Sequence, residues 1–285
     1  MMFYVIDDYN IIPTNKYKIL LNSKKRNCEI YKFAGKEGNI MRIIFIRHGD
    51  PNYENDCLTE KGEREAKLLA KRVAKWENIT QFYCSPLGRA KQTASYSLAA
   101  VGKEAVTYEW MKEFMYKIED PTTGRHGVPW DFMPEYWTAI PEMYDKENWR
   151  KTDIYRSNPE LIPAYDEVCA GLDTVLSSYG YEREHNYYKN NNPVAADGTV
   201  KQDTIVIFCH LGITCVMMSH LLGFSPALLF HDFFLAPTSV TVLATEERQN
   251  SIAHFRAQVI GDTSHLSQGG EQISTAGYFT DVFQG

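Results

Sequence analysis

Arg47 and His48 are the residues of this chain whose types and position most clearly indicate chemistry. They directly follow residues 43–46, a short apolar run rich in β-branched side chains that predicts a buried strand. A guanidinium can bind two phosphate oxygens through parallel hydrogen bonds. A neutral imidazole beside it can attack phosphorus, because the cation holds the electrophile and stabilises charge on its oxygens. The pair therefore indicates phosphoryl transfer at the C-terminal end of this strand.

Three more functional side chains follow other predicted strands. Arg89 lies in the first turn of a helix predicted to begin at Ser85 and Pro86, where free backbone N–H groups also favour a phosphate. His210 directly follows the most apolar strand, and Glu113 lies three residues beyond another one. Because the carboxyl ends of parallel strands meet at one edge of a sheet, we expect these side chains to join the arginine–histidine pair.

Together these five residues suit phosphoryl transfer. The two arginines would bind and neutralise the phosphoryl oxygens. One histidine would be the nucleophile, and the other would donate a hydrogen bond to the same oxygens. Glu113 would donate a proton to the leaving oxygen and then take one from water.

The ordered motifs resemble those of the histidine phosphatase superfamily, the phosphoglycerate-mutase-like group. The matching segments span roughly residues 41–260, without the region 115–165, and are Arg47-His48-Gly49, Leu58-Thr59 with Gly62, Ser85-Pro86-Leu87 with Arg89-Ala90 and Gln92-Thr93-Ala94, and His210 with Gly212. The resemblance implies that His48 becomes phosphorylated and that water or a second substrate then resolves the phosphohistidine. It also implies that Arg47, Arg89 and His210 form the phosphate pocket, and that the reaction needs neither a metal nor another cofactor.

The family's general acid usually lies in a Leu-x-Glu stretch after the third strand, and here that stretch reads Trp-Met-Lys-Glu-Phe. We prefer Glu113 to Glu109 as the acid, because Glu109 falls inside the predicted strand. Only residues 50–57 lie between Arg47-His48-Gly49 and Leu58-Thr59. The mutases carry a longer run there, so this short spacing is closer to the phosphatase branch. Neither Asn52 nor Asn55 aligns with the asparagine that mutases carry in this run.

Strand and helix patterns alternate beyond residue 41. The predicted strands cover residues 43–46, 79–84, 106–110, 203–209, 240–244 and 255–260. Helices are expected to begin at Thr59, as an N-cap, and at Ser85, and to cover residues 212–222 up to Gly223. This rhythm predicts an α/β fold, a three-layer α/β/α sandwich with a mostly parallel sheet.

Some regions interrupt the rhythm. Residues 115–165 are rich in aromatics and proline, and we interpret them as a cap inserted over the C-terminal edge of the sheet. The tryptophans of this cap would form a small core of their own or line the substrate site as a lid. Residues 181–202 are polar and read as a surface loop. A second Arg-His-Gly, at residues 125–127, follows a turn rather than a strand, and we interpret its match to the first triplet as coincidence.

The domain organisation follows from these patterns. Residues 1–40 are predicted to be an N-terminal extension, and residues 41–285 the catalytic domain. The extension is either an appendage before a natural start at Met41 or a short hairpin packed on the core.

Composition limits the partners. The net charge of −6 over 285 residues does not indicate a basic surface that would bind nucleic acid. A small phosphorylated substrate can still bind in a local basic pocket. The six cysteines form no CxxC pair and no zinc-type cluster, so we expect free thiols, with Cys84 and Cys209 buried. Without a membrane-length apolar run or a signal peptide, a cytoplasmic protein is expected. The oligomeric state is not indicated.

The sequence therefore predicts a metal-independent phosphatase that hydrolyses a small phosphomonoester through a phosphohistidine. Two alternatives stay open. One is a phosphoglycerate-type mutase, and the other is a protein that binds a phosphorylated ligand with negligible turnover.

Overall fold

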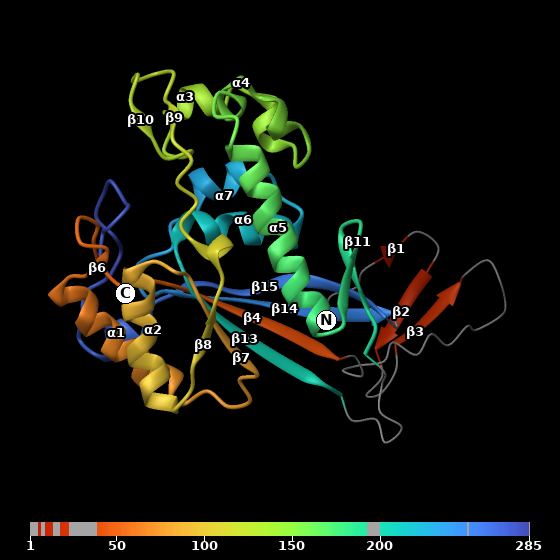
Figure 1. Ribbon diagram of the computed structural model, residues 1–285. Coiled ribbons are helices and arrows are strands. Elements are labelled where there is room, and N and C mark those ends of the chain that lie inside the picture. The colour runs from red at the N-terminus through yellow and green to blue at the C-terminus, as the bar shows by residue number, and fades with distance from the viewer. Residues whose placement is uncertain are drawn as a thin grey trace.

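The computed structural model describes residues 5–6, 9–13, 18–22, 39–192, 200–249 and 251–284. Its main element is an eight-stranded sheet (Figure 1) with the order β11-β12-β15-β14-β4-β13-β7-β8. Four neighbouring strands are parallel: β4 (Ile40–Arg47), β13 (Gln202–Cys209), β7 (Gln81–Cys84) and β8 (Ala105–Thr107). The other four extend the sheet in antiparallel pairs: β14 (Val240–Gln249), β15 (Ile252–Asp262), β12 (Tyr187–Asn190) and β11 (Tyr181–Glu184).

Helices cover both faces of the sheet because its central strands are apolar on both sides. In β4, Ile43 and Phe45 belong to one buried cluster, and Ile44 and Ile46 to another, as the two-residue period of a strand requires. The helices over the first cluster are α5 (Leu161–Ser178), α6 (Leu211–Leu222) and α7 (Pro226–Asp232). Those over the second are α1 (Glu60–Val73) and α2 (Gly88–Val101).

Helix boundaries agree with the turn chemistry at two of three predicted places. Thr59 is the N-cap of α1, where its hydroxyl accepts a hydrogen bond from the backbone N–H of Gly62. Gly223 ends α6 in the left-handed conformation, with φ of +73°. However, α2 begins at Gly88 rather than at Ser85. The reason is that the Ser85 hydroxyl is hydrogen-bonded to His210 and does not cap the helix.

One predicted strand ends earlier than expected, and one predicted loop was wrong. Strand β8 ends at Thr107, and a 3-10 helix, η1 (Glu109–Met111), follows it, so Glu109 is not in a strand but on the exposed surface. Residues 181–190 are not a loop but the hairpin β11–β12 at the sheet edge. The polar composition hid this hairpin, because only a few side chains such as Tyr181 and Tyr188 are buried. Residues 193–199 lie outside the described part of the chain.

Residues 115–165 hold only short elements before α5 begins. They are β9 (Ile118–Glu119), β10 (His126–Gly127), α3 (Pro134–Trp137), α4 (Asp153–Arg156) and the 3-10 helices η2 (Pro141–Tyr144) and η3 (Asn148–Lys151). Figure 1 shows β9, β10, α3 and α4 above α6 and α7. Trp137 and Trp149 are buried in the same cluster as residues of α5 to α7, so they extend the main core and do not form a separate one.

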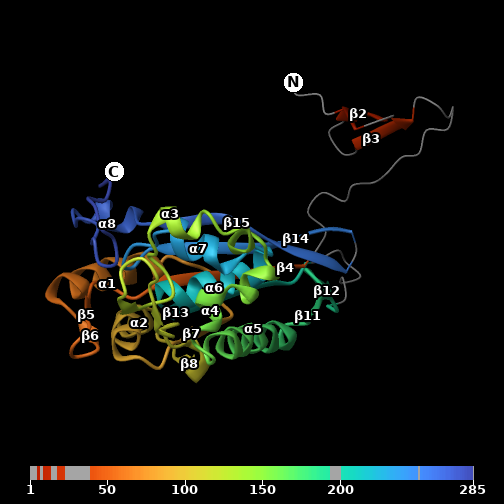
Figure 2. The same ribbon diagram turned by 90° about the horizontal axis from the view of Figure 1, so that it is seen from above.

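Three features lie at the ends of the chain. The N-terminal strands β1 (Val5–Ile6), β2 (Tyr9–Pro13) and β3 (Lys18–Asn22) form an antiparallel sheet of their own. Their side chains, and so the predicted packing on the core, fall outside the described residues. Near the other end, α8 (Ser264–Gln268) lies beside α1 (Figure 2). Among the described residues, no helix is both long enough and apolar enough to cross a membrane.

Candidate active site

The parallel register brings the strand-end residues together. In the ladder Cys209 lies opposite Arg47, so His210 and His48 leave neighbouring strands at the same level. The backbone N–H of His48 donates to the carbonyl of Cys209 at 3.0 Å, and that of Ser85 donates to Phe208 at 2.9 Å. The two imidazole centroids are 5.0 Å apart.

His48 has the protonation state of a nucleophile. Its Nδ1 lies 2.7 Å from the carbonyl oxygen of Gly49, which can only accept, so Nδ1 carries the hydrogen and Nε2 has a free lone pair. The residue is 1% exposed. Burial, followed by the positive charge of Arg47, holds its pKa well below the ordinary value, and Arg89 adds to this. His48 is therefore neutral.

His210 has a hydroxyl as its partner instead of a carbonyl. Its Nε2 lies 2.7 Å from the hydroxyl oxygen of Ser85, which also accepts a hydrogen bond from the backbone N–H of Leu87 at 3.2 Å. A hydroxyl can donate or accept, and we propose that it donates to Nε2, which places the hydrogen of His210 on Nδ1. This Nδ1 is buried and has no partner among the described residues. Burial and the neighbouring His48 keep the pKa of His210 well below its ordinary value.

Arg47 is buried and held from two sides. Nη1 donates to the carbonyl of Leu235 at 2.7 Å, and Nη2 donates to the carbonyl of Ala276 at 2.9 Å. Burial lowers its pKa, and the charges of Tyr53 and Glu113 oppose that shift. Its Nε is buried and has no partner within the described chain.

Arg89 lies in the first turn of α2, beside a carboxylate. Its Nη1 lies 2.5 Å from one oxygen of Asp56, and the other oxygen accepts from the backbone N–H of Gly88 at 2.5 Å. The ring of Tyr53 lies under the guanidinium, 5.5 Å from it. Asp56 and Tyr53 belong to the loop that carries the hairpin β5 (Pro51–Asn52) and β6 (Cys57–Leu58). This loop therefore orients Arg89, whose Nε is also buried without a partner in the described residues.

Glu113 lies at the N-terminus of α6. One carboxylate oxygen accepts from the backbone N–H groups of Phe114 at 2.8 Å and of Ile213 at 3.0 Å. Burial raises its pKa, although both hydrogen bonds and the two site arginines act in the other direction. The site needs a glycine at position 212, where a Cβ would lie 2.5 Å from Trp130 and 2.9 Å from Glu113.

A cavity of about 380 Å³ opens beside Glu113. It is also lined by Leu87, which directly precedes α2, and by Lys112, Met115 and Lys117. Of the five predicted site residues, Glu113 is the one that lines it. The second Arg-His-Gly has no part in these contacts, since His126 is exposed and lies 3.6 Å from Glu119.

The sequence did not predict the roles of two residues and one segment that contribute to the site. Ser85 was interpreted as a helix cap, and its bond to His210 depends on two strands being neighbours. Asp56 stood in the short run before Leu58 without an assigned role. The third is the segment near Ala276, which acts on Arg47 through a backbone carbonyl and so leaves no signal in side-chain types. No cluster of three or more metal-ligating side chains occurs in the described residues.

Comparisons with known proteins agree with the motifs. The family model of the histidine phosphatase superfamily, branch 1, matches residues 43–129. A probable phosphoglycerate mutase of Photorhabdus laumondii is 23% identical over 193 residues, which are 64% of this chain and 78% of that protein. Phosphoglycerate mutase-like protein 4 of Arabidopsis thaliana is 24% identical over 162 residues, 53% of this chain and 67% of that protein.

The fold has a counterpart among solved structures. A variant of the phosphoserine phosphatase of Entamoeba histolytica, solved with phosphoserine, superposes with a TM-score of 0.51 at 20% identity, covering 79% of this chain and 99% of that one. This likeness confirms the predicted α/β fold, and the sequence matches confirm the resemblance that the motifs indicated. The chain is thus similar to the histidine phosphatase superfamily, whose family model matches it over residues 43–129.

Proposed function

We propose that the protein is a metal-independent phosphatase that hydrolyses a small phosphomonoester through a phosphohistidine at His48. One observation carries this proposal. Three buried nitrogen atoms, Arg47 Nε, Arg89 Nε and His210 Nδ1, have no hydrogen-bond partner among the described residues. Unpaired buried donors cost free energy, and the oxygens of a phosphoryl group would satisfy them.

The first half of the reaction transfers the phosphoryl group to the protein. The lone pair on His48 Nε2 attacks phosphorus while the bond from phosphorus to the leaving oxygen breaks. The arginines stabilise charge on the phosphoryl oxygens. Protonated Glu113, whose pKa is raised by burial, gives its proton to the leaving oxygen, so the product leaves as an alcohol.

The second half regenerates the site. Glu113, now a carboxylate, takes a proton from a water molecule, whose oxygen attacks the phosphorus of the phosphohistidine. The bond from phosphorus to nitrogen breaks, inorganic phosphate leaves, and His48 returns to its neutral form. Every proton is then accounted for by residues of the chain and by water.

The first experiment measures hydrolysis of p-nitrophenyl phosphate. We expect His48→Ala to lower the turnover number by more than about 1,000-fold, because it removes the nucleophile. His126→Ala, in the second Arg-His-Gly, is the matched control and should keep wild-type activity. A chelator should leave the wild-type rate unchanged. Normal turnover by His48→Ala, or a strict requirement for an added divalent metal, would contradict the mechanism.

The same protein separates the two alternatives. A phosphoglycerate-type mutase would need a bisphosphate primer and would transfer the phosphoryl group to a second hydroxyl, so we expect no primer dependence here. A phospho-ligand-binding protein would accumulate phosphohistidine and release it slowly. Mass spectrometry after alkaline denaturation, which preserves phosphohistidine, should instead find it only as a transient during turnover.

A further inference from the structure

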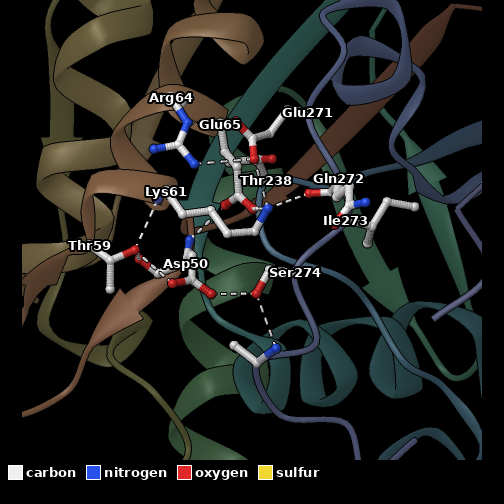
Figure 3. Close-up of polar contacts among 12 residues, drawn as sticks. Asp50, Thr59, Lys61, Arg64, Glu65, Thr238, Glu271, Gln272, Ile273 and Ser274 are labelled. Atoms are coloured by element: carbon white, nitrogen blue, oxygen red, sulfur yellow. Dashed lines mark hydrogen bonds and ion pairs between the residues drawn. The ribbon is translucent and has the colours of Figure 1, made fainter. Parts of the chain in front are cut away.

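The segment from Glu271 to Tyr278 is attached to the N-terminal end of α1. The Glu271 carboxylate accepts from Lys61 Nζ at 3.0 Å and from Arg64 Nε at 2.7 Å. Lys61 also donates to the backbone carbonyl of Gln272. Figure 3 shows Lys61 reaching across to these two residues. Lys61 and Arg64 are both side chains of α1, so the start of the segment is fixed relative to the sheet.

Ser274 continues this attachment directly beside the catalytic triplet. It is buried, and its hydroxyl donates to one carboxylate oxygen of Asp50, the residue that follows Arg47-His48-Gly49 (Figure 3). The other oxygen of Asp50 accepts from the hydroxyl of Thr59 at 2.6 Å. The Ser274 hydroxyl also accepts from the backbone N–H of Ala276 at 3.1 Å, which turns the chain toward the site.

The end of the segment lies on Arg47. The Ala276 carbonyl accepts from Nη2, and a Cβ on Gly277 would lie 3.2 Å from the same nitrogen. The ring of Tyr278 packs on that of Phe234 with centroids 4.6 Å apart, and the Arg47 guanidinium lies 5.9 Å from the Phe234 ring. The guanidinium is therefore enclosed between the segment and the loop before β14.

We propose that residues 271–278 are a structural part of the phosphoryl site, and that Ser274 and Asp50 are positioning residues that hold the Ala276 carbonyl against Arg47. This inference rests on the proposed function. With each Nη bound to a carbonyl of a different segment, the guanidinium has one orientation before any ligand arrives. Preorganised donors bind developing charge more strongly than mobile ones, because no reorganisation accompanies binding.

The test measures binding of orthovanadate, an analogue of the phosphoryl group, and hydrolysis of p-nitrophenyl phosphate. We expect Ser274→Ala to raise both the dissociation constant of orthovanadate and the KM by about ten-fold, as loss of a hydrogen bond to a charged group implies, with a smaller change in kcat. Ser267→Ala, on α8 and outside the segment, is the matched control. Ser267 is exposed and its hydroxyl donates to the backbone carbonyl of Ser264 in its own helix, so this variant should match wild type.

A double-mutant cycle separates positioning from a general loss of stability. If Ser274 acts through Arg47, Ser274→Ala should weaken orthovanadate binding far less in an Arg47→Ala background than in wild type. A chain ended after Gly270 should reproduce the Ser274→Ala effect and show the same dependence on Arg47. Equal behaviour of Ser274→Ala and Ser267→Ala, or an undiminished effect without Arg47, would overturn the inference. Wild-type protein that binds no orthovanadate would instead contradict the proposed function itself.

Discussion

The two histidine rings, with centroids 5.0 Å apart, have different hydrogen-bond partners. A carbonyl can only accept, so Gly49 places the hydrogen of His48 on Nδ1 and leaves Nε2 as a base. In the tautomer proposed for His210, the Ser85 hydroxyl donates to Nε2 and leaves Nδ1 as a donor. Burial keeps both rings neutral, with a pKa well below the ordinary value in each case. The proposed division into nucleophile and donor then depends on one atom beside each ring.

Glu113→Gln tests the general acid. We expect the rate of the first half-reaction, measured as release of the leaving group in a single turnover, to fall about 100-fold for an alkyl phosphate and much less for p-nitrophenyl phosphate, because nitrophenolate leaves without a proton. The sign of the pH dependence follows from the raised pKa of Glu113. Only the protonated acid can donate, so this first-half rate of the wild type for the alkyl phosphate should decline as pH rises through that pKa.

This decline in rate should occur above the pH range in which an ordinary carboxyl group titrates. It should be missing in Glu113→Gln. Exposed Glu109, the alternative acid, provides the control: Glu109→Gln should keep the wild-type profile. If Glu109→Gln lost activity on the alkyl phosphate and Glu113→Gln did not, the assignment of the acid would be wrong.

Ser85→Ala tests whether the hydroxyl sets the His210 tautomer. Without it, His210 can place its hydrogen on either nitrogen, and we expect kcat/KM to fall about ten-fold, the effect of one buried hydrogen bond to a charged transition state. Ser85→Thr, which keeps the hydroxyl, should recover most of the activity. Ser95→Ala, on the exposed side of α2, is the control, since its hydroxyl only contacts the backbone of its own helix. A threonine variant as poor as the alanine variant would argue for a packing role.

At the scale of elements, most of the central sheet and of the candidate site could be predicted from the sequence. Strands such as β4 and β13 are continuous apolar runs, so their ends could be located, and the functional residues follow those ends directly. The hairpin β11–β12 could not be found, since its pairing supplies the buried contacts that its polar sequence lacks. The segment 271–278 was missed for a similar reason, because its contact with Arg47 is made by a backbone carbonyl.

The contact between α6 and the loop that carries Glu113 depends on Gly212. A Cβ there would approach Trp130 to 2.5 Å and the Glu113 carboxylate to 2.9 Å. We expect Gly212→Ala to lower the free energy of unfolding by about 2 kcal/mol, as overpacking of a tight contact does, and to reduce kcat by displacing Glu113. Gly127→Ala is the control, because no atom lies within 4 Å of the place that its Cβ would take. Thermal unfolding and the alkyl phosphate assay measure both effects, and wild-type behaviour of Gly212→Ala would contradict this packing argument.

At the scale of the whole molecule, the phosphoryl site joins distant parts of the chain. Arg47 ends β4, its guanidinium is held by Leu235 and Ala276, and Asp50 beside it bonds to Ser274. Glu65, on α1, accepts from the backbone N–H of Asp50 at 2.8 Å (Figure 3). Folding of the domain and assembly of the site are therefore coupled through a few buried polar contacts.

Glu65 makes that coupling depend on pH. Burial, with the nearby charge of Asp50 adding to it, raises the pKa of Glu65 from 4.5 to about 7, against the backbone hydrogen bond and Lys61. An acid whose pKa is higher in the folded state stabilises the fold fully below the unfolded pKa. That contribution is lost as pH rises from about 4.5 to about 7, because the unfolded chain ionises first.

Glu65→Gln isolates this contribution from the buried histidines, which titrate in both proteins. We expect the free energy of unfolding of wild type, relative to the variant, to fall by up to about 3 kcal/mol between pH 4.5 and 7 and to level off above it. Chemical denaturation at a series of pH values measures the difference. A constant difference for Glu65→Gln would mean that this carboxyl group titrates alike in the folded and unfolded chain, and that the site at Asp50 is not coupled to its protonation.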